Sequence, residues 1–183
     1  MAGRLVELVG WVGVEMGGGG GRVVVGVGGS LGSLAALHRA VGVARGSGGE
    51  VVAVLTWVPP GGEHGYRRSP CPPLLAAVRA AAEERLRTAL AEAFGGGGAG
   101  VPMRSVLVRG EAGPALVAMA YRAEDVLVVG AGRGRWWRPS VARYALRHAT
   151  CPVLAVPRPA LQRELESYHR RSLLHLPHEP LPQ

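Results

Sequence analysis

The sequence predicts an α/β fold, a three-layer sandwich built on a Rossmann-like, doubly wound, five-stranded parallel sheet. Strand-like and helix-like segments alternate along the chain, which is the pattern of parallel strands joined by helical crossovers. The strand-like segments are also nearly all apolar, as expected for strands that have helices on both faces. Right-handed crossovers then leave the doubly wound sandwich as the expected architecture.

The expected strands share a high content of Val and other apolar residues. Each of them is followed within two residues by Gly or Pro, which commonly end a strand. The run from Val23 to Val27 is the clearest example, because it leads directly into a glycine turn. The expected strands lie at residues 23–27, 51–58, 101–108, 125–129 and 152–156.

The segments between the strands have the composition or spacing of helices. The first begins after Ser30, a residue type that caps helices, keeps an apolar stripe at helical spacing, and closes at Gly46–Gly49. A loop dense in Pro and Gly is expected at residues 59–73, before a long helix of Ala, Leu, Glu and Arg. The later helices are expected at about residues 74–94, 114–121 and 140–148.

Two appendages flank the expected domain at residues 22–157. Residues 1–21 end in a run of glycines, Gly17 to Gly21, which is typical of a flexible linker. This extension is therefore expected to be flexible, with an ordered add-on or a later start of translation as alternatives. Residues 158–183 contain one amphipathic segment, 161–174, for which docking on its own domain is favoured over binding to lipid or RNA.

Composition narrows the classes of function. The chain has 183 residues, 48% of them hydrophobic, which suits one compact core, and its formal net charge is +8. Apart from His, every basic residue is Arg, and the chain contains no Lys, Ile or Asn. A GC-rich genome explains this bias, because the codons of the absent residues are rich in A and T. Nucleic acid is therefore not an expected partner, because no RNA-binding motif accompanies the charge.

The cysteine content and the lengths of the apolar runs indicate the cellular compartment. Cys71 and Cys151 are too few for a disulfide framework, which favours a reducing compartment. No apolar run reaches the roughly 18 to 20 residues of a membrane span. The sequence thus predicts a cytoplasmic protein without a membrane partner.

Two Gly-rich turns, at residues 28–30 and 130–134, are expected on the same rim of the sheet. Both follow strands near the switch point, where doubly wound sheets bind their ligands. Residues 131–150 carry five arginines and no acidic residue. One interpretation is an anion site made of backbone amides, a helix N-terminus and cations; the other is a plain connection with solvated arginines. The arginines nearest the second turn are Arg133, Arg135 and Arg138.

Two further pairs have a functional and a structural interpretation. Trp136-Trp137 can stack on a base or anchor a partner, but coverage of the sheet's end by an indole is favoured. His148 and Cys151 stand three residues apart, yet no second His/Cys pair supports a zinc site and no third group supports a nucleophile. Neither pair therefore predicts a catalytic site.

Four segments of the chain resemble the universal stress protein family in order and spacing. They comprise the first strand with its turn, the start of the next helix, the fourth strand, and a His-Ala-x-Cys-Pro-Val segment entering the last strand. These segments are residues 22–30, 32–37, 127–130 and 146–156. The resemblance implies strand order 3-2-1-4-5, a homodimer paired through the last strands, and no metal.

In the nucleotide-binding branch of this family, the resemblance implies ATP held by an Asp after the first strand and by a glycine motif. The chain departs from both: Gly28 stands at the Asp position, and Pro139 at that of the motif's second Gly. Nine residues separate Gly130 from Ser140, whereas the family spacing is thirteen. The single Asp of the chain, Asp125, begins the fourth strand at the opposite rim. The expected pocket residues are Gly28, Ser30, Val58, Gly130, Gly132, Arg133, Gly134, Ser140 and Val141.

The sequence therefore predicts a universal-stress-type, non-enzymatic, dimeric stress-response or regulatory protein. Its altered pocket is expected to bind ATP weakly or not at all, unless arginines compensate for the lost contacts. One alternative is a switch that binds or hydrolyses ATP, for which no base or acidic magnesium ligand stands at the right rim. A second alternative is a basic RNA-associated domain, which rests only on the Arg-rich loop.

Overall fold

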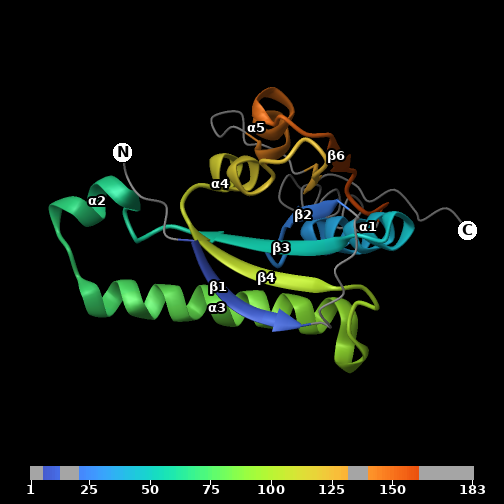
Figure 1. Cartoon of the computed structure of the whole chain (residues 1–183). Coiled ribbons are helices and arrows are strands. Elements are labelled where there is room, and N and C mark those ends of the chain that lie inside the picture. Colours follow the sequence, from blue (N-terminus) through green and yellow to red (C-terminus); the bar gives the residue numbers. More distant parts are fainter. Residues whose placement is uncertain (1–5, 13–20, 132–139, 161–183) are drawn as a thin grey trace, which may run out of the picture.

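The computed structural model describes residues 6–12, 21–131 and 140–160, which build one mixed sheet between helical layers (Figure 1). The strand order is β1-β4-β3-β2-β5-β6. Strands β2 to β6 are parallel in the order 3-2-1-4-5 of the sequence prediction, which is confirmed. The strands are β1 (Val6–Val12), β2 (Arg22–Gly26), β3 (Glu50–Trp57), β4 (Met103–Arg109), β5 (Val126–Gly130) and β6 (Val153–Val156).

Helices cover both faces of the sheet and divide the core into two clusters. Alternate strand residues such as Val23 and Val25 pack against α1 and α3, while Val24 and Leu127 face α4 and α5. Figure 1 shows α3 along one side of the sheet and α4 with α5 on the other. The helices are α1 (Leu31–Ser47), α2 (Gly62–Arg68), α3 (Pro72–Phe94), the short 3-10 turn η1 (Gly95–Gly97), α4 (Ala112–Met119) and α5 (Val141–His148). The predicted three-layer sandwich is thus confirmed.

Residues 6–12 of the amino-terminal extension form β1, which agrees with the alternative of an ordered add-on; residues 1–5 and 13–20 lie outside the described part of the chain. This strand pairs antiparallel with β4, from Val6 opposite Val108 to Val12 opposite Met103. The segment is rich in Val, Leu and Trp, which favour strands, and the β4 edge offers unpaired backbone groups. The sheet therefore has six strands, one of them antiparallel, where five parallel strands were predicted.

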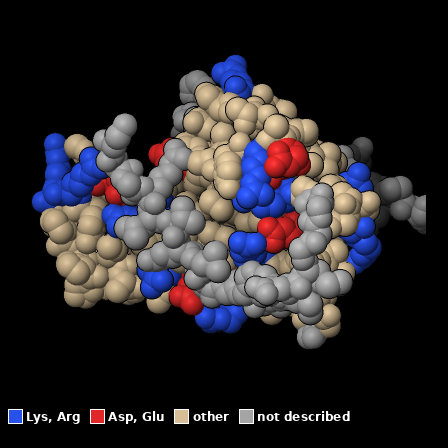
Figure 2. Space-filling model, in the orientation of Figure 1, with Lys and Arg blue, Asp and Glu red and all other residues tan. Residues whose placement is uncertain are grey.

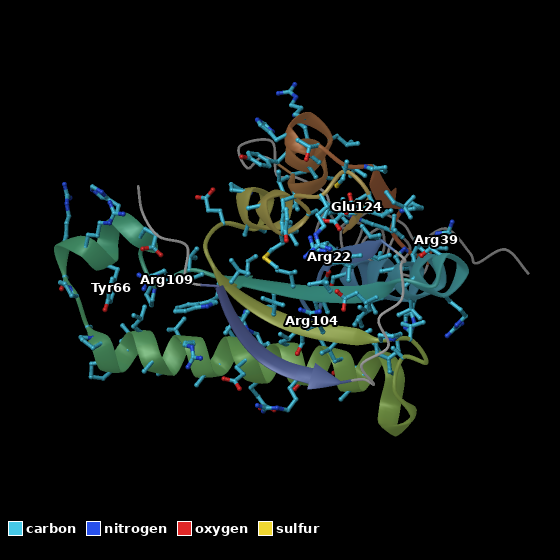
Figure 3. The ribbon with its side chains drawn as sticks, viewed as in Figure 1. Arg22, Arg39, Tyr66, Arg104, Arg109 and Glu124 are labelled. Atoms are coloured by element: carbon cyan, nitrogen blue, oxygen red, sulfur yellow. The ribbon has the colours of Figure 1, made fainter. Side chains whose placement is uncertain are left out.

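The loop predicted at residues 59–73 contains a helix, α2. Gly61 and Gly62 adopt positive φ angles of 74° and 72°, which turn the chain into this helix. None of its residues is buried, so no apolar periodicity marks it in the sequence. Glu63 of α2 instead accepts hydrogen bonds of 2.8 and 3.0 Å from Arg109 at the end of β4. The guanidinium of Arg109 also lies over Tyr66, as Figure 3 shows.

At the amino-terminal rim, Asp125 is completely buried and paired with Arg22. The guanidinium donates to both carboxylate oxygens, at 3.1 and 2.6 Å, and the backbone N–H of Arg122 donates at 3.1 Å. The hydrogen bonds from Arg22 to Asp125 raise the pKa of Arg22 above its ordinary value, although burial of the guanidinium acts in the opposite direction. The single Asp is therefore a structural brace at the rim opposite the expected ligand site.

Charges on the face seen in Figure 2 are of both signs, with acidic side chains beside several of the basic ones. Glu50, for example, accepts hydrogen bonds from Arg104 at 3.0 and 3.1 Å. Within the described part of the chain, no helix combines the length and apolar character needed to cross a membrane.

Candidate functional site

A pocket of about 380 Å³ opens at the carboxyl ends of β2 and β5, where the strand order reverses. The turn after β2 contributes Gly28 and Ser30, the end of β5 contributes Gly130, and the start of α5 contributes Val141. This volume falls in the range of about 300–1,000 Å³ typical of small-molecule sites. The pocket thus lies at the switch point, as the sequence predicts for a ligand site.

The structure brings four of the predicted pocket residues together, namely Gly28, Ser30, Gly130 and Val141. Val58 does not line this pocket and is 43% exposed just beyond β3. Ser140 caps α5, where its Oγ accepts a hydrogen bond of 3.0 Å from the N–H of Arg143. The remaining predicted pocket residues, Gly132, Arg133 and Gly134, lie outside the described part of the chain. The tryptophan pair, Trp136 and Trp137, lies outside it as well.

The floor of the pocket is held in place by a capping box at the start of α1. The Oγ of Ser30 accepts from the N–H of Ser33 at 3.2 Å, and the N–H of Ser30 donates to the Oγ of Ser33 at 3.0 Å. This confirms Ser30 as the N-cap and uses two backbone donors that would otherwise be free. The turn is therefore fixed before any ligand arrives.

Gly130 is required by the close approach of β5 to α1. A Cβ on this residue would lie 2.8 Å from the carbonyl oxygen of Gly32, and backbone cannot move aside cheaply. Gly28 is different, since a Cβ there would meet nothing within 4 Å and its φ lies outside the left-handed region. The space beside Gly28 is therefore open to a side chain that this sequence does not supply.

Two arginines line the pocket, although the sequence did not indicate them as site residues. Arg85 reaches it from α3, and Arg158 from the segment after β6, where its Nε donates to the carbonyl of Ala131 at 3.3 Å. Arg87, two residues further along α3, does not line the pocket and pairs with Glu83 and Glu84. Residues two apart on a helix lie on nearly opposite sides, and Arg85 stands three residues after buried Ala82 and four before buried Ala89.

The described lining residues therefore favour an anion. They include two arginines and no Asp, Glu or His. Hydroxyl groups of Ser30, Ser33 and Thr56 add polar contacts around a mainly apolar wall. Within the described residues, no cluster of three or more His, Cys, Asp or Glu side chains could hold a metal ion.

The fold and this pocket define a class: doubly wound α/β proteins with a small-ligand site at the switch point. The sequence profile of the Universal stress protein family matches residues 21–157, and the chain belongs to that family. The matched region begins just before β2 and ends after β6, so it spans the parallel part of the sheet. No curated protein sequence matches the chain.

Solved structures agree with this assignment. A universal stress protein in complex with cAMP is 26% identical, with a TM-score of 0.50, and the match covers 76% of this chain and 98% of that one. The universal stress protein UspA from Lactobacillus plantarum is 20% identical, with a TM-score of 0.56 over 74% and 97% of the two chains. A hypothetical protein whose function was assigned from its structure is 16% identical, with a TM-score of 0.59 over 76% and 96%. The last two support the fold alone.

Proposed function

We propose that this universal stress protein is a non-enzymatic, dimeric regulatory protein whose pocket binds a nucleotide through its phosphate. The observation that carries the proposal is the pair of cations, Arg85 and Arg158, in the lining of the pocket. Gly28 lines the same pocket at the position where the family resemblance implies an Asp for the ribose. The cAMP complex of a relative supports a nucleotide with a single phosphate as the ligand class.

The missing carboxylate lowers the expected affinity. A charge-assisted hydrogen bond contributes about 1.5–3 kcal/mol, and a micromolar site has about 8 kcal/mol in total. Losing one such bond weakens a micromolar site by about 10- to 150-fold. An arginine fork that grips a phosphate offsets part of this loss, so we expect dissociation constants of tens to hundreds of micromolar.

The chemistry of the lining supports a binding role over ATP hydrolysis. Phosphoryl transfer needs a group that orients the attacking water and acidic ligands for magnesium. The described lining residues include no Asp, Glu or His. Asp125 lies before β5 at the other rim and is occupied by Arg22.

The proposed dimer uses β6, the edge strand at one end of the sheet. β6 pairs with β5 on one side, from Val153 opposite Leu127 to Val156 opposite Gly130. Ala155 in this strand is exposed and the other three residues are only half-buried. Antiparallel pairing of two β6 strands about a two-fold axis would continue the sheet through both subunits.

A cytoplasmic location is proposed on the basis of the cysteines. Cys71 is exposed and Cys151 buried, and both are free thiols. Free thiols are stable in a reducing compartment.

Calorimetric titration of the full chain with AMP, cAMP and ATP tests the ligand proposal. Arg85→Ala should weaken binding by about tenfold or more, as expected for one lost charged contact. Arg87→Ala, on the same helix but paired with Glu83 and Glu84 outside the pocket, is the matched control and should bind like the parent. Absence of binding at millimolar nucleotide would contradict the proposal.

Two further measurements test the non-enzymatic and dimeric parts. Incubation with ATP and magnesium should release no phosphate above the rate of a heat-denatured sample. Phosphate release that Ser140→Ala abolishes would contradict the proposal, because it would assign a catalytic step to the pocket rim. Sedimentation at tens of micromolar should give the mass of a dimer, and a monomer at that concentration would refute the β6 pairing.

A further inference from the structure

Strand β4 is an interior strand only because β1 covers it. On one side β4 pairs with β3 over its whole length, from Val51 opposite Met103 to Trp57 opposite Arg109. On the other side it pairs only with β1. Figure 1 shows β1 running alongside β4 at the opposite end of the sheet from β6. Without β1 the sheet would have two free edges, β4 and β6.

A bare β4 would be a strong template for a second strand. It has seven residues and its ladder with β3 has no bulge. Val106, Leu107 and Val108 are each no more than 1% exposed, so this stretch of the strand, between Arg104 and Arg109, is apolar on both faces. Long, regular, apolar edges of this kind promote pairing between molecules.

The outer edge that β1 presents is much less regular. The register of β1 against β4 shifts between Leu8 and Gly10, so the strand contains a bulge. Bulges bend a strand and interrupt its ladder, and they are a common protection of sheet edges. Replacing β4 by β1 as the edge therefore makes this end of the sheet a poor template.

The connection between β1 and β2 has the length needed for pairing within one molecule. Val12 lies opposite Met103, which is opposite Val51, and Val51 is opposite Val23 of β2. Three strand spacings amount to about 14 Å. The nine residues between Val12 and Arg22 include five consecutive glycines. Nine residues reach at most about 30–32 Å when fully extended, so the chain is long enough to join β1 to β2 within one molecule.

We propose that β1 is a guard strand, which pairs with β4 of its own chain and prevents a second copy of the protein from pairing there. With both β4 and β6 exposed, copies can join edge to edge in open chains. With β4 covered, association is limited to β6 and closes at a dimer. The size of the closed assembly depends on the proposed β6 dimer. The covering of β4 by β1 does not depend on that dimer.

Amide hydrogen exchange on the intact chain tests the pairing directly. Successive β4 amides point alternately toward β3 and toward β1, and both sets should exchange slowly. Exchange of the β1-facing set at the rate of an unstructured chain, with the other set protected, would overturn the proposal. This measurement requires no variant and so does not depend on the folding of a shortened chain.

The consequence for assembly is tested with a chain that begins at Met16 and therefore lacks β1. Sedimentation at increasing concentration should show its average mass rising to at least about twice that of the full chain, without a plateau. A chain lacking only residues 1–4 keeps β1 and is the matched control, which should behave like the full chain. Equal masses for the Met16 chain and the full chain, with circular dichroism showing both folded, would overturn the guard role. A full chain that is itself monomeric would refute only the β6 dimer.

Discussion

Gly28→Asp should strengthen the binding of a nucleotide to the pocket. Gly28 lines the pocket at the end of β2, and a Cβ there meets nothing within 4 Å. Its φ is also outside the range that disfavours side chains, so Asp can be accommodated without backbone strain. The substitution places a carboxylate where the family resemblance implies one for the ribose hydroxyls.

The size of the gain follows from two opposing effects. A charge-assisted hydrogen bond to a ribose hydroxyl contributes about 1.5–3 kcal/mol. Repulsion between the new carboxylate and a phosphate about 8 Å away costs about 0.5 kcal/mol in a water-like medium. The net gain of about 1–2.5 kcal/mol tightens AMP binding by about 5- to 70-fold. The affinity for cAMP should increase less than that for AMP, because the 3′ oxygen of cAMP is esterified and only one ribose hydroxyl is free.

Isothermal titration of the parent and the variant with AMP and cAMP measures this difference. Gly42→Asp is the matched control, because Gly42 lies on α1 away from the pocket lining and a Cβ added there would also meet no atom within 4 Å. This control should leave both affinities unchanged, which separates a local contact from a change in net charge. An AMP affinity that is equal in Gly28→Asp and the parent would refute the placement of the ribose beside Gly28.

Four other outcomes follow from the packing. Gly130→Ala should lower the free energy of unfolding in urea by about 1–3 kcal/mol, because its Cβ would overpack the α1 backbone; parental stability would contradict that close approach. Asp125→Ala should lower the free energy of unfolding by about 3–5 kcal/mol, because the largely buried guanidinium of Arg22 loses its carboxylate partner. Glu84→Ala removes an exposed ion pair, and its free energy of unfolding should stay within about 0.5 kcal/mol of the parent. Burial raises the pKa of the Cys151 thiol, so an alkylating reagent should label exposed Cys71 first and Cys151 only on unfolding; equal labelling rates in the folded protein would disprove this. Because the folded state favours the Cys151 thiol over the thiolate, its contribution to stability should fall as the pH rises past the ordinary thiol range.

Strands β2 to β5 could be predicted because their central residues are buried on both faces, which leaves a nearly continuous apolar run in the sequence. β2 and β5 are examples, and their central residues are completely or almost completely buried. The pairing of β1 with β4 joins segments far apart in the chain and leaves no such local pattern. α2 was missed for a related reason, since it is held by Glu63 and Arg109 and not by an apolar face.

The site was predictable where it depends on the ends of strands. Gly28 and Gly130 lie at the ends of β2 and β5, and the topology alone brings these turns to one rim. Arg85 and Arg158 could not be assigned to the pocket, because their positions depend on how α3 and the chain after β6 pass over that rim. The presence of two cations in the pocket lining is therefore a tertiary feature.

The proposed function requires a nucleotide to occupy the pocket between the turn after β2 and the end of β5. Backbone amide chemical shifts recorded during titration with AMP report on that occupation residue by residue. We expect saturable shifts concentrated at Gly28, Ser30, Gly130 and Val141, with Asp125 and its surroundings at the opposite rim unchanged. Shifts absent at millimolar AMP, or concentrated away from these residues, would contradict nucleotide binding in this pocket.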